Sequence, residues 1–330
     1  MSYLPANSIT RRVFSIAGLF ASLTVSLAAL AQSGSGDGIP RLSNGLPDLQ
    51  GTWDFRTITP LQRPEQYGDR EYLTPEEAAE FEVARQEQLD RDNFTDTTTT
   101  GDYNEFWYDR GNEILGTNRT SLITSPANGR LPERTEEANA IAAAARRAAE
   151  LNHGIEVRPL SERCIMGFNS GPPMLPSAYN NNVQLVQTGD HVLIHNEMVH
   201  NARIVKMDTD QHREFPRKWE GDSIGYWDGN TLVVETRNFA GATSFMNSSE
   251  HMELTEKFWL IDANTLGYEF TVNDPTRWTR PWTAMFPMVR AREPIYEYAC
   301  HEGNYSMAGI MAGWRTLEVQ EEIAASRESR

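Results

Sequence analysis

YNNNVQLVQTGDHVLIHNEMVHNAR, from Tyr179 to Arg203, is the stretch that decides the fold class predicted from the sequence. Its apolar runs at 183–186 and 192–194 flank the turn Thr188-Gly189-Asp190, a pattern typical of a β-hairpin. Four polar side chains follow at an interval that an ordinary core strand does not need: His195, Glu197, His200 and Arg203. We expect this hairpin to wall a site; the alternative is two solvent-facing histidines beside a Glu–Arg ion pair.

The chain after this hairpin carries further strand signals. Asp228-Gly229 between apolar runs predicts a tight hairpin turn, and 262–264 separates the next two strands. Further strands are expected at 282–288 and 295–300. Successive hairpins predict an antiparallel meander, and closure into a barrel removes its exposed edges. One predicted strand face has a clear period of two: Leu266, Tyr268, Phe270 and Val272.

The first half of the chain predicts accessory helices on this barrel. Thr74 and Glu77 form a capping-box pattern that starts a helix ending near residue 89, and Thr135 precedes an alanine-rich helix at 138–151. The predicted fold is therefore mainly β with accessory helices. Its expected parts are an N-terminal segment at 46–178 with the first strands, a barrel core at 179–315 and a flexible tail at 316–330.

Residues 1–31 are expected to be a signal peptide. Arg11 and Arg12 precede an apolar run at 16–30, shorter than the roughly 20 residues of a spanning helix, and 29–31 fits a cleavage site. The arginine pair resembles the twin-arginine export signal, although ordinary signals also contain adjacent arginines. A periplasmic or secreted location follows, with residues 32–45 as a linker and no membrane span.

The charge balance restricts the expected partners. Removing Arg11 and Arg12 from the 30 basic side chains leaves 28 against 46 acidic ones, a net charge of −18. Such an excess argues against nucleic acid and anionic membranes as partners. The chain contains no phosphate-binding glycine loop, dinucleotide fingerprint, GxSxG elbow or EF-hand loop. We therefore expect a small-molecule substrate, no cofactor and no metal, and the sequence leaves the oligomeric state open.

The two cysteines, Cys164 and Cys300, most simply form one disulfide in an oxidising compartment. A reactive thiol is the competing interpretation. The disulfide would hold the C-terminal segment against the loop at 161–176, which lies shortly before the opening hairpin.

Two further polar clusters are candidates for acid/base chemistry. His251 follows Glu250 just before a predicted strand, where it would lie at a barrel mouth, although turn chemistry also explains it. Glu297 is in phase with the apolar residues of the predicted strand 295–300, with His301 next to it. A carboxylate buried on that face would need to be neutral, paired or metal-bound.

Other side chains are candidates for holding a substrate. Tyr179 and Asn181 precede the hairpin, and the segment 274–282 offers arginines for an anionic group and tryptophans for an aromatic mouth. The candidate substrate-binding residues are Tyr179, Asn181, Arg203, Trp227, Trp278 and Trp282.

Several strings together resemble those of a large group of uncharacterised exported bacterial proteins. They are PDLQGTW, RTSLITSPANGRLP, ERCIMG, AYNNN, NEMVHNARIV, GDSIGYWDGNTLVVET, DPTRWTRPW and YEYACHEGNY. The resemblance spans roughly 47–315 and implies no particular chemistry. The Gly51-x-Trp53 opening is similar to the start of lipocalin-like (calycin) barrels, in which the tryptophan plugs the closed end. This likeness implies a lipocalin-like barrel by analogy.

Three functions are consistent with these patterns. The first is an exported, cofactor-independent lyase or isomerase acting on a small aromatic or apolar molecule in a barrel cavity. Its base would be Glu197 or Glu297, and Tyr179 or Arg203 would stabilise a developing oxyanion. Its acid would be one of three histidines: His200, His251 or His301. The second is a non-catalytic periplasmic carrier, and the third is a metal-dependent hydrolase that uses one of these histidines with a glutamate.

Overall fold

The computed structural model describes residues 38–93, 104–151, 154–241 and 245–328. The expected signal peptide at 1–31 and the start of the linker lie outside these residues. None of the helices described is both long enough and apolar enough to cross a membrane.

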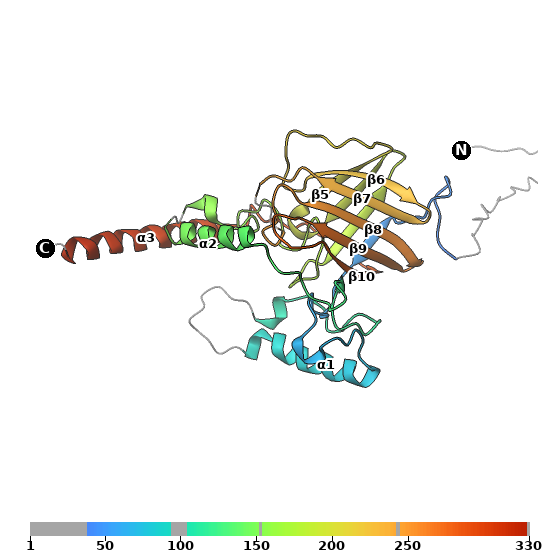
Figure 1. Ribbon diagram of the computed structural model, residues 1–330, viewed down its shortest axis with the longest axis horizontal. Helices are drawn as coiled ribbons and strands as arrows, with labels where there is room; N and C mark the ends of the chain where they lie inside the picture. The colour runs from blue at the N-terminus through green and yellow to red at the C-terminus, as the bar shows by residue number, and fades with distance from the viewer. Residues whose placement is uncertain (1–37, 94–103, 152–153, 242–244, 329–330) are drawn as a thin grey trace, which may run out of the picture.

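The main body of the protein is a closed β-barrel of nine strands (Figure 1). The ring closes between its first and last strands, where Trp53 lies opposite Arg290 and Asp54 opposite Val289. In their order around the ring, the strands are β1 (Gly51–Asp54), β3 (Asn182–Gln187), β4 (His191–Asn196), β5 (Ala202–Met207), β6 (Asp222–Asp228), β7 (Thr231–Arg237), β8 (Glu253–Asp262), β9 (Thr265–Asn273) and β10 (Trp282–Arg290). A short strand, β2 (Ile123–Ser125), pairs with the start of β10.

The neighbouring strands pair antiparallel except β5 and β6, which are parallel. The purely antiparallel meander predicted from the sequence is therefore wrong at this point. The cause is the connection at 208–221, which returns the chain to the end of the barrel where β5 began, so that β6 starts in the same direction. Phe215 in this connection is 76 % exposed, and Figure 1 shows the segment passing outside the barrel.

The interior of the barrel follows the alternation expected of strands. The predicted face of β9 is confirmed, because all four of its apolar and aromatic side chains are fully buried: Leu266, Tyr268, Phe270 and Val272. The adjacent strand β8 buries Leu254, Phe258 and Leu260 in the same core. Between them β8 also buries a carboxylate, Glu256, which has no exposed surface.

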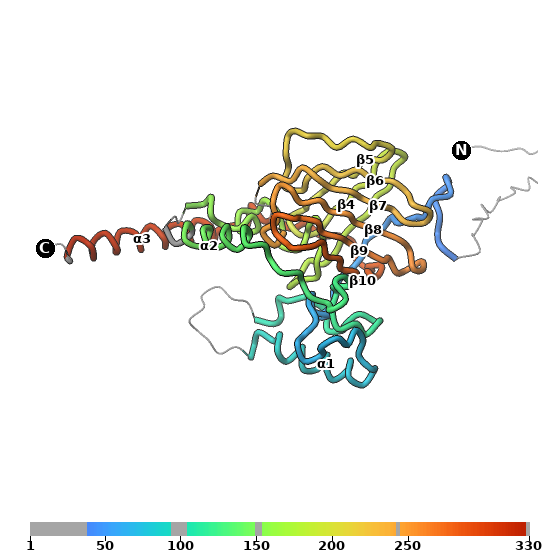
Figure 2. Tube along the Cα trace, viewed as in Figure 1, coloured from blue at the N-terminus to red at the C-terminus, as the bar shows by residue number. Residues whose placement is uncertain are grey.

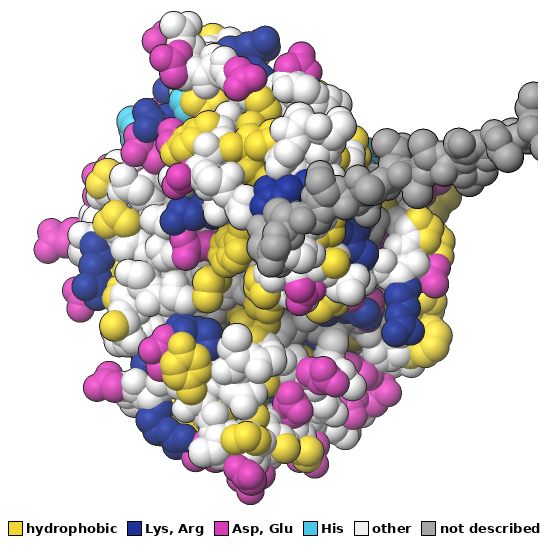
Figure 3. Space-filling model, turned by 90° about the vertical axis from the view of Figure 1, so that its right-hand side faces the viewer, with side chains coloured by type: hydrophobic (Ala, Val, Ile, Leu, Met, Phe, Trp, Pro, Cys, Tyr) yellow, Lys and Arg dark blue, Asp and Glu magenta, His cyan; other side chains and the backbone are white. Residues whose placement is uncertain are grey.

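Residues 38–50 cover one end of the barrel, which Figure 3 shows from outside with acidic and basic side chains interspersed. Trp53 is fully buried there, and its indole N–H donates to the carbonyl of Leu49 at 2.9 Å. The Arg290 guanidinium stacks on the Trp53 ring, 4.2 Å from its centroid. A Cβ atom at Gly51, where φ is +126°, would collide with this guanidinium. Trp53 thus fills this end of the barrel.

Three helices lie outside the barrel: α1 (Pro75–Leu89), α2 (Glu136–Leu151) and α3 (Tyr305–Glu328). The capping box of α1 is confirmed, with Thr74 Oγ1 accepting from the Glu77 N–H at 3.2 Å and the Glu77 carboxylate accepting from the Thr74 N–H at 2.9 Å. Figure 2 shows α2 and α3 beyond the end of the barrel opposite residues 38–50, and α1 to one side. Short 3₁₀ helices occur at Glu65–Tyr67, Arg91–Asn93, Glu105–Trp107, Ile155–Val157 and Met198–His200.

One expectation for the C-terminal part is wrong. The segment 295–300 is not a strand, because β1 already pairs with β10 and leaves that edge of the ring closed. The helix α3 begins at Tyr305, within the range assigned to the barrel core, and continues through the expected tail as far as Glu328. Alanine, glutamate and arginine, which favour helices, are frequent in this segment.

Candidate functional site

The barrel interior holds a buried ion pair. Arg203 lies on β5 and forms two hydrogen bonds with Glu256 on β8, of 2.5 and 3.0 Å. The Tyr268 hydroxyl donates to the same carboxylate at 2.7 Å, and Thr236 Oγ1 accepts from Arg203 at 3.1 Å. Arg203, which was expected to bind substrate, instead forms this ion pair inside the core. Burial, followed by the negative charge of Glu256, raises the pKa of Tyr268 well above its usual value.

The loop at 164–181 closes the barrel end opposite residues 38–50. Its Met174 is fully buried, and the Met174 N–H donates to the Tyr268 hydroxyl at 3.1 Å. Asn196 at the end of β4 holds the loop by donating to the carbonyl of Ser170 at 2.9 Å. The interior is therefore occupied by side chains of the protein itself, where the sequence predicts a ligand cavity.

Asn181 is fully buried in the same region. Its amide group donates to the carbonyls of Asp109 and Ser177, both at 3.0 Å, and accepts from the Ser177 N–H at 2.8 Å. These bonds join the N-terminal segment to the start of β3. Asn181, a candidate substrate-binding residue, is therefore a structural one.

The predicted meeting of the opening hairpin with the C-terminal segment is observed. The Tyr298 N–H donates to His200 Nε2 at 2.9 Å, so that the Nε2 lone pair is occupied by the protein. Glu197 is buried and accepts from the Asn182 amide at 2.6 Å. Burial, and then the neighbouring His200, lower the pKa of His195. His200 thus anchors the segment 295–300 on the outer wall of the barrel, whereas Glu197 is bound to the start of β3.

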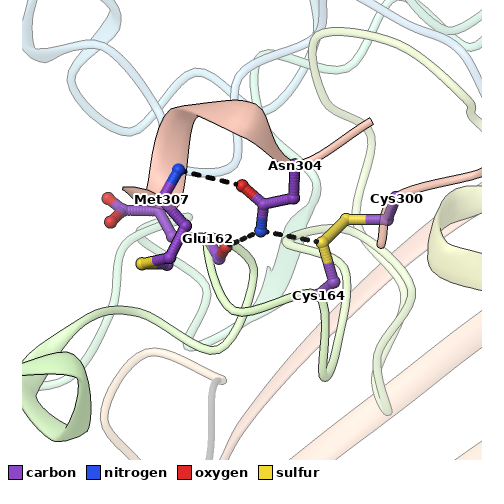
Figure 4. Close-up of a disulfide and its surroundings, with 5 residues drawn as sticks. All are labelled: Glu162, Cys164, Cys300, Asn304 and Met307. Atoms are coloured by element: carbon purple, nitrogen blue, oxygen red, sulfur yellow. Dashed lines mark hydrogen bonds between the residues drawn. A yellow bond between two sulfur atoms is a disulfide. The ribbon is translucent and has the colours of Figure 1, made fainter. Parts of the chain in front are cut away.

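The disulfide between Cys164 and Cys300 is confirmed, with a Cα–Cα distance of 5.7 Å. Figure 4 shows Asn304 beside it, donating to the Glu162 carbonyl at 2.8 Å and accepting from the Met307 N–H at 3.2 Å. Such a bond fits a protein of an oxidising, extracytoplasmic compartment.

Glu297 and His301, adjacent to this disulfide, are both exposed. The expectation of a carboxylate buried on an apolar strand is therefore wrong, because the segment 295–300 lies on the surface without strand alternation. A shallow recess of about 370 Å³ beside the disulfide is lined by Glu297 but not by His301.

His251 lies elsewhere, in a recess of about 270 Å³ beside α2. Its side chain is 62 % exposed and its Nε2 is 3.8 Å from Glu250. Arg277 lines the same recess and donates to the Asn247 carbonyl at 2.9 Å. The predicted acid/base residues are thus divided between this recess and the outer wall near His200, and do not form one site.

A recess of about 720 Å³ lies next to that of His251, at the barrel end that the loop at 164–181 closes. We call it the mouth recess, and it shares Gly241 with the His251 recess. Phe168 and Trp219 line it with exposed aromatic surface, and Arg158 and Arg163 supply positive charge. Arg158 is paired with Glu162 at 2.6 Å. The Arg163 guanidinium has no bonding partner among the residues that the structure describes.

The remaining candidates lie around or beneath this end. Tyr179 contacts Phe168 edge to face, with ring centroids 5.5 Å apart. Trp278 and Trp282 are buried in the core, where Trp282 stacks on Phe245 at 6.0 Å. Trp227 is half-buried near the opposite end of the barrel. The two buried tryptophans therefore fill the core, and neither lines the mouth recess.

Within the described ranges, no three His, Cys, Asp or Glu side chains come together as a group able to hold a metal ion. Comparison with protein-family models and with curated proteins found no match to this chain. Functional inference therefore depends on the geometry of its recesses.

Arg163, Phe168 and Trp219 were not among the residues selected from the sequence. Phe168 and Arg163 lie in the Gly- and Pro-rich loop around Cys164, which sequence patterns identify only as an ordered loop. The available signal was a charged side chain just before Cys164, at Arg163, and an aromatic side chain shortly after it, at Phe168.

Proposed function

We propose that this exported protein binds a small organic anion with an aromatic or apolar body in the mouth recess. The observation that carries the proposal is the half-buried Arg163 guanidinium beside Phe168 and Trp219, which has no partner in the described part of the chain. Ligand sites combine an apolar or aromatic lining with a few polar groups that fix orientation. A guanidinium offers forked donors that match a carboxylate, and aromatic faces accept a flat apolar body.

The recess size supports a small ligand. Its volume of about 720 Å³ lies within the roughly 300–1,000 Å³ of small-molecule sites. The net negative charge of the protein repels anions at long range. The Arg163 guanidinium, which has no partner among the described residues, attracts an anion at short range at the mouth. This function corresponds to the periplasmic carrier expected from the sequence, with the site moved from the barrel interior to its mouth.

Acid/base catalysis is the second candidate function, because His251 and Arg277 line the adjoining recess. A ligand held by Arg163 and extending past Gly241 would present its far end to the His251 imidazole. There His251 would move a proton and Arg277 would stabilise a developing oxyanion, as a lyase or isomerase requires.

Binding is tested by titrating the purified mature protein with benzoate, cinnamate and their uncharged amides, following tryptophan fluorescence. We expect saturable changes for the carboxylates and at least about tenfold weaker binding by Arg163→Gln, since a charged hydrogen bond contributes about 1.5–3 kcal/mol. Trp219→Phe should abolish the fluorescence change while calorimetry still detects binding. Arg292→Gln, which removes an exposed arginine outside the recess, is the matched control.

Absence of saturable binding by every compound, or equal affinity of the Arg163→Gln and native proteins, would refute the binding proposal. For catalysis, a bound compound is incubated with the protein and analysed by mass spectrometry. Turnover lost in His251→Gln with binding retained supports the lyase or isomerase. Binding without turnover supports the carrier.

A further inference from the structure

A second recess, whose lining includes no residue selected from the sequence, lies between α1 and the loop that precedes β3. Its volume is about 360 Å³. Three arginines line it from the N-terminal segment: Arg85, Arg91 and Arg110. We call it the arginine recess. Its other polar walls come from Thr57, Thr59 and Ser177, and Leu61 and Leu89 contribute apolar surface.

The positive charge of the arginine recess is not matched by its own walls. No Asp or Glu occurs among the described residues that line it. Glu105 lies nearby and accepts from Arg110 Nη2 at 3.2 Å and from the Arg91 main-chain N–H at 3.1 Å. Glu105 is therefore bound to Arg110 and to the Arg91 main chain, and it has no hydrogen bond to Arg85.

Arg85 has a buried hydrogen-bond donor that lacks an acceptor. Its Nη1 donates to the neutral Gln88 carbonyl oxygen at 2.6 Å, and its Nε is buried without a hydrogen-bond acceptor. Burial lowers the pKa of Arg85, and the positive charge of Arg110 lowers it further. Two like charges are therefore held close enough to repel each other. Native proteins rarely leave a buried charged donor without an acceptor.

The other groups hold the guanidinium of Arg110 in place. It lies over the Tyr108 ring, 4.1 Å from the centroid, and Nη1 donates to the Leu89 carbonyl at 2.8 Å. Arg85 and Leu89 both belong to α1, so the helix fixes the two guanidinium groups relative to each other. A preorganised pair of arginines loses little side-chain entropy when an anion binds between them.

We propose that the arginine recess is a binding site for an oxyanion, meaning the phosphate, sulfate or carboxylate group of a small ligand. Such a group would accept from Arg85 Nε and relieve the repulsion between Arg85 and Arg110. The apolar walls leave room only for a short body beside the charged group. This site is independent of the mouth recess, since the two share no lining residue.

The test uses the mature protein in chloride buffer at fixed ionic strength, with phosphate, sulfate or benzoate replacing part of the chloride. Thermal unfolding and calorimetry should show saturable stabilisation by at least one of these anions. In Arg85→Gln that binding should weaken at least about tenfold, because a charged hydrogen-bond donor is lost. In chloride alone, Arg85→Gln should unfold at the same temperature as the native protein or higher, because a repelled charge is removed.

Arg292→Gln, which removes an exposed arginine outside both recesses, is the matched control and should leave phosphate and sulfate binding unchanged. Comparison of Arg85→Gln with Arg163→Gln then assigns benzoate binding to one recess or the other. Tighter binding of phosphate or sulfate identifies a free inorganic oxyanion, and tighter benzoate binding that depends on Arg85 identifies an organic acid; both support the proposal. Failure of all three anions to bind at Arg85 overturns it. A lower unfolding temperature of Arg85→Gln in chloride also overturns it, because Arg85 would then be a structural residue. Neither result affects the proposal for Arg163.

Discussion

The main-chain N–H of Met174 donates a hydrogen bond of 3.1 Å to the phenol oxygen of Tyr268 inside the barrel. Because the same phenol donates to Glu256 at 2.7 Å, the loop at 164–181 is connected directly to the buried ion pair of Glu256 with Arg203. The loop at 164–181 and the buried ion pair therefore stabilise one another. This link explains why a loop without regular structure can occupy the end of the barrel.

We expect Tyr268→Phe to destabilise the protein by about 1–3 kcal/mol, because the Met174 N–H loses its acceptor and Glu256 loses a donor. Urea unfolding of the purified protein measures this change. Tyr226→Phe is the matched control, since Tyr226 is exposed and its hydroxyl lies 3.5 Å from Glu235. The control should change stability by less than about 0.5 kcal/mol. Equal effects of the two substitutions would contradict the assigned role of Tyr268.

The buried ion pair leads to a prediction of non-additivity. Arg203→Met or Glu256→Met alone should destabilise by about 3–5 kcal/mol, because each leaves the partner's charge buried and unpaired. The double variant should be less destabilised than the sum of the single variants, and replacement of such pairs by apolar residues is often neutral. Denaturant unfolding of the four proteins gives the coupling free energy. Additive effects would show that the two charges do not interact.

Local patterns predicted most of the fold. The period of two in β9 and the Asp228-Gly229 turn depend on neighbouring residues, so the sequence alone located these strands. The parallel pairing of β5 with β6 was not predictable in the same way, because the connection at 208–221 contains no signal for its direction. The strand prediction for 295–300 was wrong because β1 pairs with β10, which leaves no free strand edge for another strand to join.

The candidate site was less predictable than the fold. Arg203 and Asn181 were selected for their polar groups. Both groups are already bonded to residues from distant parts of the chain, Arg203 to Glu256 and Asn181 to Asp109. The disulfide was predicted, and with it the nearness of the C-terminal segment to the opening hairpin, but the specific contact between His200 and Tyr298 was not. Sequence patterns show which side chains are polar, but only tertiary structure shows which of them already have partners.

The Cys164–Cys300 disulfide should stabilise the C-terminal segment more than the barrel. Its sequence separation of 136 gives an upper limit of about 5 kcal/mol by the chain-entropy relation. The last barrel strand ends at Arg290, however, so a broken bond can release residues 291–304 without opening the ring. For the Cys164→Ser/Cys300→Ser variant we expect faster hydrogen exchange in that segment and a smaller loss in global unfolding free energy than the limit. Unchanged exchange there would contradict this division.

Stability should also depend on pH through His195, whose pKa is lowered by burial and by His200. The unfolded state then binds a proton more readily than the folded state, so this contribution is complete above the usual histidine pKa of about 6.5 and is lost as pH falls below it. The unfolding free energy should therefore decrease from about pH 7.5 to about pH 5.5, with a slope of at most about 1.4 kcal/mol per pH unit for one proton.

His195→Gln should flatten the profile in this window, because no proton is then taken up at that position. The pKa of Asp190 is also lowered, chiefly by its hydrogen bond with His191. Burial raises the pKa of Asp222, but the hydrogen bond from Lys206 and other contacts outweigh it, so that this pKa too is lowered. Their contributions are lost only at more acidic pH, near and below the usual aspartate pKa of about 3.9. The two windows are therefore separable by urea unfolding at a series of pH values, with the His195 imidazole followed by NMR. A His195 resonance that titrates above pH 6.5, or an identical slope in His195→Gln, would show that His195 is not the group responsible.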